Sequence, residues 1–348
     1  MFQVKESSGF KFISHHWLTI AFVLGFITDF ILLDRVDDKI DNAILFFYVV
    51  LATLSIILFY LGVADRLGER LSGFLVKYAT IAMQYAFGGL LSGMLIFYGR
   101  SGDFSTSAPF LLIIMGTILV NELLTKRSNR LLYNVSVYFI GLFSYCVLIV
   151  PVWLGDMGDI IFVGSGLLAL LITFILIKLL GKIIPNFLTL QMRWLVFIIG
   201  SIYGVFNFMY FLNIIPPIPL SLTELSIYQG VEKTDNGNYR INKEDKAWYQ
   251  EMFSLTTTFT PKAGDGAYCF ARVYAPTDLK TKVTHVWEYQ DGNGDWQEHF
   301  RYDYSVSGEN KNGYRGYTVV KSLSAGKWRC TVENSRGQVL GHRTLPSI

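Results

Sequence analysis

The sequence predicts a membrane α-helical bundle of about seven transmembrane helices, followed by an all-β sandwich domain. Its 348 residues are 52% hydrophobic and only 16% charged, whereas soluble domains are about 25% charged. The charges are unevenly spread: residues 1–219 carry 14 Lys and Arg with 12 Asp and Glu, while the shorter stretch 220–348 carries 16 and 15. This contrast indicates a membrane-embedded part followed by a water-soluble part.

Seven apolar segments are long enough to cross the roughly 30 Å hydrocarbon core of a bilayer as helices. Short polar turns separate them, which is typical of antiparallel neighbours. The first segment lacks a small-residue cleavage site and six more follow it, so we interpret it as a retained helix rather than a signal peptide. The seven segments form a polytopic domain over 1–215, with spans at 12–33, 43–63, 74–98, 108–124, 131–154, 160–180 and 190–214.

The basic residues predict the orientation of the bundle. Eleven Lys and Arg lie at the ends that share a side with the N-terminus, and three lie at the opposite ends: Arg35, Lys39 and Arg100. Because cytoplasmic loops are enriched in Lys and Arg, the N-terminus is expected in the cytoplasm. Seven crossings of the inner (cytoplasmic) membrane then place residues 220–348 in the periplasm or outside the cell.

Four ionisable residues fall in or near the predicted spans: Asp29, Glu122, Lys178 and Arg193. Such residues are functional candidates by default, as parts of a proton or ion relay. All four lie near predicted span ends, so we favour structural roles. Glu122 precedes Lys126 by one helical turn, which suits an ordinary i,i+4 ion pair. Small residues between 88 and 93 predict close helix packing.

The segment Pro216-Pro217-Ile218-Pro219 is a linker that cannot continue the last helix, because proline lacks a backbone N–H and restricts the residue before it. After it, long apolar runs give way to short alternating ones separated by turn residues, which is typical of β-structure. The strands expected in the domain 220–348 cover 248–260, 268–275, 282–290, 295–306, 314–323, 327–333 and 338–344.

The turn Asp291-Gly292-Asn293-Gly294 predicts a hairpin. If Gln290 opposes Asp295, one face carries His285, Trp287 and Tyr289 with Trp296, Glu298 and Phe300, and the other face is polar. The aromatic face could be a stacking platform for sugars or the core of a sandwich, and we favour the core because the opposite face is too polar to bury. The residues kept as candidates for ligand contact are Tyr289, Trp296 and Arg315.

Two cysteines are expected to point into the domain from different strands. Cys330 alternates with Trp328 and Val332, and Cys269 alternates with Ala271 and Val273. Outside the cytoplasm they could form a disulfide, although two buried free thiols would satisfy the same pattern. The third cysteine, Cys146, falls inside the fifth predicted span.

Two family resemblances follow from these residues. The order Cys269, Trp287, Cys330 and the approach Ser324-Ala325-Gly326-Lys327-Trp328-Arg329-Cys330 resemble immunoglobulin-like domains. Four segments resemble domain of unknown function 2914 in the DUF series. They are His285-Val286-Trp287, Gly313-Tyr314-Arg315-Gly316-Tyr317, Gly326-Lys327-Trp328-Arg329 and Gly337-Gln338-Val339-Leu340-Gly341. Three segments upstream are similar to the membrane region that accompanies this domain: Tyr98-Gly99-Arg100-Ser101-Gly102, Asn121-Glu122 and Ile215-Pro216-Pro217-Ile218-Pro219-Leu220-Ser221-Leu222. The resemblance implies a bacterial polytopic membrane protein with a C-terminal β-domain, and it implies no particular activity.

The sequence holds none of the common phosphate-binding, dinucleotide-binding or zinc motifs. We therefore predict no catalytic residue, metal or cofactor, and the nearly balanced charge argues against a nucleic-acid partner. The favoured function is an envelope protein that contacts the lipid bilayer and binds a glycan, peptide or protein through its β-sandwich. The alternatives are a membrane enzyme acting on a lipid-linked substrate, and a transporter or channel component.

Overall fold

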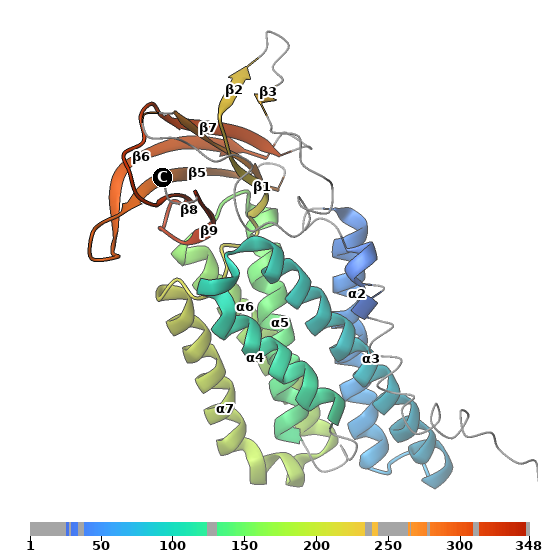
Figure 1. Ribbon diagram of the computed structural model, residues 1–348. Coiled ribbons are helices and arrows are strands. Elements are labelled where there is room, and N and C mark those ends of the chain that lie inside the picture. Colours follow the sequence, from blue (N-terminus) through green and yellow to red (C-terminus); the bar gives the residue numbers. More distant parts are fainter. Residues whose placement is uncertain are drawn as a thin grey trace, which may run out of the picture. The chain divides into compact units, whose positions relative to one another are not determined.

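The computed structural model describes residues 26–27, 29–33, 38–123, 131–233, 239–242, 264, 266–276, 279–308 and 313–345. The chain forms two compact units. The helical unit contains Met1–Phe97, Phe110–Val150 and Asp159–Phe208. The β unit contains Met209–Ile348 together with two connections between helices, Tyr98–Pro109 and Pro151–Gly158 (Figure 1).

Long helices make up the described part of the chain before the β-strands: α2 (Lys39–Val63), α3 (Glu69–Ser101), α4 (Phe104–Leu123), α5 (Leu131–Leu154), α6 (Asp159–Ile183) and α7 (Pro185–Phe211). All except α4 are long and apolar enough to cross a membrane, and α4 contains a shorter apolar stretch, Thr106–Val120. Residues 26–27 and 29–32 are helical, and the rest of the first predicted span lies outside the described residues. The helices thus fit a membrane protein, and the count of seven spans stays a prediction.

Local sequence explains where several helices begin and end. Asp38 caps α2, since its Oδ1 accepts a hydrogen bond from the Ile40 N–H at 2.7 Å. Pro185 opens α7, at a position where a missing N–H costs nothing. Gly155 ends α5 with a φ of 67°, a conformation that glycine adopts without strain.

Large apolar side chains are exposed along the helices of the helical unit. Soluble proteins rarely expose apolar patches of this extent, whereas lipid chains would cover them. They include Phe46, Phe47 and Leu54 of α2, Leu171, Phe174 and Ile175 of α6, and Val196 and Phe197 of α7. This exposure agrees with the apolar composition in assigning the helices to a membrane.

The β unit contains two larger antiparallel sheets and a two-stranded one. The three-stranded sheet has the order β1 (Ser221–Tyr228), β4 (Ala267–Tyr274), β7 (Tyr314–Val320). The four-stranded sheet has the order β6 (Trp296–Ser307), β5 (Lys280–Gln290), β8 (Trp328–Asn334), β9 (Val339–Thr344). The third sheet pairs β2 (Gly230–Lys233) with β3 (Tyr239–Asn242).

The sequence predicted β4 to β9 to within a few residues and missed β1, β2 and β3. The predicted strand 248–260 lies outside the described residues. In β1 the buried Leu225 and Ile227 alternate with the more polar Glu224 and Ser226. The alternation that marks a half-buried strand is therefore present, but it covers only four residues.

The inner faces of the two larger sheets share one apolar core. Trp287, Cys330 and Val332 from one sheet pack in the same cluster as Cys269 and Val273 from the other. Trp287 and Trp328 are buried, with exposed fractions of 0% and 2%. The prediction that these two tryptophans are core residues is confirmed.

The predicted register of the β5–β6 hairpin is wrong by one residue. Gln290 pairs with Trp296, not with Asp295. The register shifts again between Glu288 and Trp287, so that Trp287 lies opposite Phe300. His299 is the extra residue at this bulge. Only Phe300 of the predicted β6 set therefore shares the inner face with Trp287, while Trp296 and Glu298 share the outer face with Glu288.

Candidate functional site

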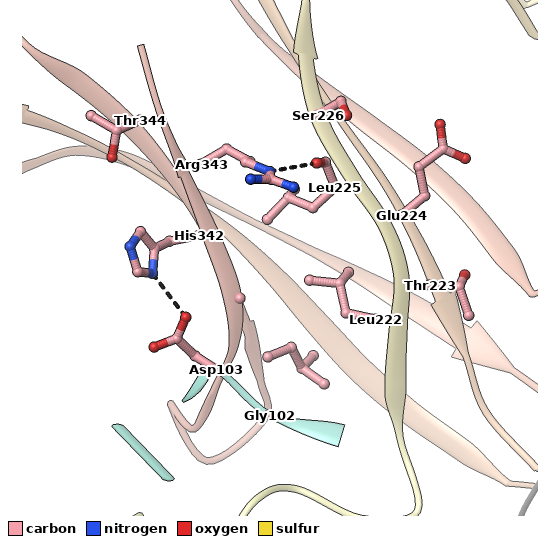
Figure 2. A pocket seen from close by; sticks show the side chains of 12 residues that line it. Gly102, Asp103, Leu222, Thr223, Glu224, Leu225, Ser226, His342, Arg343 and Thr344 are labelled. Carbon is pink, nitrogen blue, oxygen red and sulfur yellow. Dashed lines mark hydrogen bonds and ion pairs between the residues drawn. The ribbon is translucent and has the colours of Figure 1, made fainter. Parts of the chain in front are cut away.

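A cavity of about 600 Å³ opens in the β unit between strands β1 and β9 (Figure 2). Its walls are five consecutive residues of each strand, from Leu222 to Ser226 and from Leu340 to Thr344, together with Gly102 and Asp103. The volume lies within the range of ordinary ligand pockets. The lining is mixed: it offers hydroxyls, charged groups, the His342 imidazole and leucine side chains, and none of its described residues is phenylalanine, tyrosine or tryptophan.

Among the strands that the structure describes, the two that line this cavity are each the edge of their sheet. β1 ends the three-stranded sheet and β9 ends the four-stranded sheet. An edge strand leaves the backbone N–H and C=O groups on its outer side without a neighbouring strand. We call the space between these two edges the seam.

Two contacts hold the seam together. The Arg343 Nε–H donates a hydrogen bond to the Leu225 carbonyl oxygen at 3.0 Å, which links the two sheets through a side chain (Figure 2). Leu222 leans on Gly341, where an added Cβ would lie only 2.6 Å from the Leu222 Cδ2. A larger residue at position 341 would require the Leu222 side chain to move.

Asp103 and His342 lie within hydrogen-bonding distance of each other at one side of the cavity. The Asp103 Oδ1 lies 3.1 Å from the His342 Nδ1 (Figure 2). The Asp103 N–H also donates to the Val339 carbonyl oxygen at 3.2 Å, so backbone and side chain both fix this loop to β9. The ring of His342 is 38% exposed. This pair can hydrogen-bond a polar group of a ligand.

A second charged cluster lies on the outer face of the four-stranded sheet. Arg329 bonds both carboxylate oxygens of Glu288, at 2.6 and 2.8 Å, and Thr331 donates a third hydrogen bond at 2.8 Å. Burial alone would raise the pKa of the Glu288 carboxyl, but these hydrogen bonds and the Arg329 charge hold that pKa below its ordinary value. The cluster is internally satisfied, and the Arg329 guanidinium also lies 4.3 Å from the centre of the Trp296 ring.

The core holds the only cluster of potential metal ligands among the described residues: Cys269, His285 and Cys330, with ligand atoms within 4.8 Å of one another. Cys269 and Cys330 form a disulfide, with an S–S distance of 2.07 Å. Because a metal ligand has to be a free thiolate, the bonded pair offers no sulfur ligand. The alternative of two free thiols, which the sequence left open, is not what the structure shows.

The His285 ring is instead part of a hydrogen-bonded chain. Its Nδ1 lies 3.1 Å from the Thr318 Oγ1, which also accepts a hydrogen bond from the Trp287 indole N–H at 2.9 Å. Its Nε2 lies 2.9 Å from the Tyr304 hydroxyl. Either neutral tautomer satisfies both nitrogens, because each hydroxyl can donate or accept. Burial lowers the pKa of His285 to about 3.

The residues proposed from the sequence as ligand contacts are not brought together. The ring centre of Tyr289 lies 5.8 Å from that of Trp328 on the inner side of its sheet, and Trp296 lies under Arg329 on the outer side. Arg315 belongs to the other sheet, opposite Arg272. The sequence missed the seam, since nothing in the chain relates Asp103 to a histidine 239 positions later.

The four ionisable residues of the predicted spans differ in their exposure to the surface. Lys178 and Arg193 are exposed, and the Lys178 ammonium lies 4.8 Å from the centre of the Phe174 ring. The side chain of Glu122 and all of Lys126 lie outside the described residues, so their pairing stays a prediction. Asp29 is buried, with 5% of its surface exposed, and it lies three residues before the end of the helical stretch 29–32; its place near a span end stays a prediction.

Comparison with known families supports part of the resemblance seen in the sequence. The model of the family described as "Protein of unknown function (DUF2914)" matches residues 280–344. This match covers strands β5 to β9 and includes His342 and Arg343 of the seam. No curated protein matches the chain.

Comparison with solved structures is uninformative. One match is the Pseudomonas fluorescens alkylpurine DNA glycosylase AlkC bound to DNA containing an abasic site analog. The identity is 11%, over 90% of this chain and 99% of that chain, and the TM-score is 0.23. A TM-score this low carries no argument about fold or function.

Proposed function

We propose that the domain that matches the DUF2914 family model over residues 280–344, β9 included, binds an extended segment of a partner polypeptide in the seam. We further propose that the chain is a multi-pass protein of the inner membrane and that its β unit meets this partner in the periplasm or outside the cell. The observation that carries the proposal is that, among the described strands, β1 and β9 each end a sheet along one cavity.

Charge and cysteine chemistry support the proposed location. The helix connections that belong to the β unit, Tyr98–Pro109 and Pro151–Gly158, contain a single basic residue, Arg100. The connections at the other helix ends contain Arg66, Arg70, Lys126, Arg127, Arg130 and Lys182. Because basic loops stay in the cytoplasm, this difference favours a β unit on the opposite side. The Cys269–Cys330 disulfide fits that oxidising side.

The shape of the seam favours an extended peptide as the ligand. A strand rises about 3.3 Å per residue, so five consecutive residues on each wall match a peptide of about five residues. Such a peptide would hydrogen-bond backbone groups along the outer sides of β1 and β9, apart from the Leu225 carbonyl that Arg343 already binds, as in other cases of strand addition. A glycan is the weaker candidate, because none of the residues that line the cavity is a phenylalanine, tyrosine or tryptophan on which a sugar could stack.

Filling the seam with a side chain tests the proposal. Ser226 lines the cavity, so Ser226→Trp is expected to obstruct it. Ser305→Trp is a matched control, since Ser305 is exposed on β6, the edge strand at the far side of the same four-stranded sheet as β9. The probe is a library of synthetic ten-residue peptides, screened against the full-length protein in lipid nanodiscs.

We expect the bound peptides to slow amide hydrogen exchange in β1 and β9, and to lose at least tenfold in affinity with Ser226→Trp but not with Ser305→Trp. Peptidoglycan fragments serve as competitors in the same assay. Competition by these fragments, or equal binding by both variants, would replace the peptide proposal with a glycan site or with a site elsewhere.

A further inference from the structure

Asp29 lies in a polar pocket inside the helical unit. Its Oδ1 is 3.1 Å from the Tyr48 hydroxyl of α2, and its Oδ2 is 2.5 Å from the Ser92 hydroxyl of α3. Both partners are neutral hydroxyls. The carboxyl group is therefore held by two different helices without a cation among these contacts.

The small residues of α3 make this arrangement possible. The ring of Tyr48 lies on Gly89, where an added Cβ would be 2.5 Å from the Tyr48 Cζ. One turn further, a Cβ on Gly93 would be 2.8 Å from a Leu45 methyl carbon. These two glycines let α2 approach α3 closely enough for Tyr48 and Ser92 to reach the same carboxyl group.

The two hydroxyls that hold Asp29 lie well inside their helices. Tyr48 is nine residues from the start of α2, and Ser92 is nine residues from the end of α3. At 1.5 Å per residue, both hydroxyls lie about 14 Å along the helix axis from those ends. A carboxylate at this depth in hydrocarbon is costly unless it is paired with a cation or neutralised by a proton.

A count of hydrogens points to the neutral form. The Ser92 Oγ lies 3.1 Å from the Gly89 carbonyl oxygen as well as 2.5 Å from Asp29, and a serine hydroxyl has one hydrogen to donate. If Asp29 carries a proton on Oδ2, it donates to Ser92, and Ser92 donates to Gly89. Tyr48 then donates to Oδ1, and every group in the pocket is satisfied without a net charge.

We propose that Asp29 is a proton-binding site of the helical unit and that it holds a proton at neutral pH. This assigns to the membrane part a ligand, the proton, which is independent of recognition at the seam. Tyr48 and Ser92 are positioning residues, because each orients one oxygen of the carboxyl group.

Infrared spectroscopy of the full-length protein in lipid nanodiscs at pH 7 tests the proposal. We expect a C=O stretching band of a protonated carboxyl group that disappears in Asp29→Asn. Asp159→Asn, which replaces an exposed acid at the start of α6, is the matched control and should leave this band unchanged. Loss of a carboxylate band in Asp29→Asn, with no change in the protonated band, would overturn the proposal.

Two further variants keep the acid and test the geometry, including the case in which Asp29→Asn fails to fold. Tyr48→Phe removes the hydrogen bond to Oδ1, so the band should move to higher wavenumber. Ser92→Ala removes the acceptor of the acidic proton and should shift the band in the same direction. A band that neither variant moves would contradict the assignment to Asp29.

Discussion

His285 is a neutral histidine in the core of the β unit, and its contacts are neutral at both ring nitrogens. The hydroxyls of Thr318 on β7 and Tyr304 on β6 face it, and the Cys269–Cys330 disulfide lies beside it. Its pKa is about 3 in the folded protein, against about 6.5 in an unfolded chain. Between these values only the unfolded chain binds the proton, so folding stability falls as pH falls below 6.5.

We therefore expect the free energy of opening of β5, measured by amide hydrogen exchange, to decrease by about 2 kcal/mol from pH 7 to pH 5 on account of His285. His285→Gln should remove this part of the pH dependence, since its amide can bond both hydroxyls without titrating in this range. Parallel pH profiles for the variant and the wild type would show that His285 is not the titrating group.

At the scale of elements, the disulfide joins β4 of one sheet to β8 of the other, across 61 positions of sequence. Closing a loop of this length in the unfolded chain corresponds to about 4 kcal/mol of stability. Replacing both Cys269 and Cys330 by alanine should lower the free energy of opening of β4 and β8 by about that amount, as read by amide exchange. Cys146→Ala, a buried cysteine in α5, is the control. A loss below about 1 kcal/mol would argue against a bonded pair.

The elements also show what the sequence can and cannot predict. Alternation and turn residues are local signals, so β4 to β9 and the inward positions of Trp287 and Cys330 followed from them. The pairing of Gln290 with Trp296 rather than Asp295 moved Trp296 and Glu298 to the outer face, and the bulge at His299 keeps Phe300 on the inner face; neither feature carries a local signal. The seam could not be predicted from the sequence for a different reason. It depends on which strands lie at the sheet edges, and pairing between segments far apart in the chain decides that.

At the scale of the whole molecule, the account rests on a β unit that meets its partner on the far side of the membrane from the basic loops. Thiol labelling in intact spheroplasts tests this most directly. The background is Cys146→Ala, with Cys269 and Cys330 left as the disulfide. Ser305→Cys places a free thiol on the exposed edge of β6, and Lys182→Cys places one at the exposed C-terminal end of α6.

With a membrane-impermeant maleimide, we predict that Ser305→Cys is labelled before the membrane is opened and that Lys182→Cys is labelled only afterwards. This result would place the seam where an envelope polypeptide can reach it. The reverse order of labelling would contradict the account, because it would put the β unit in the cytoplasm.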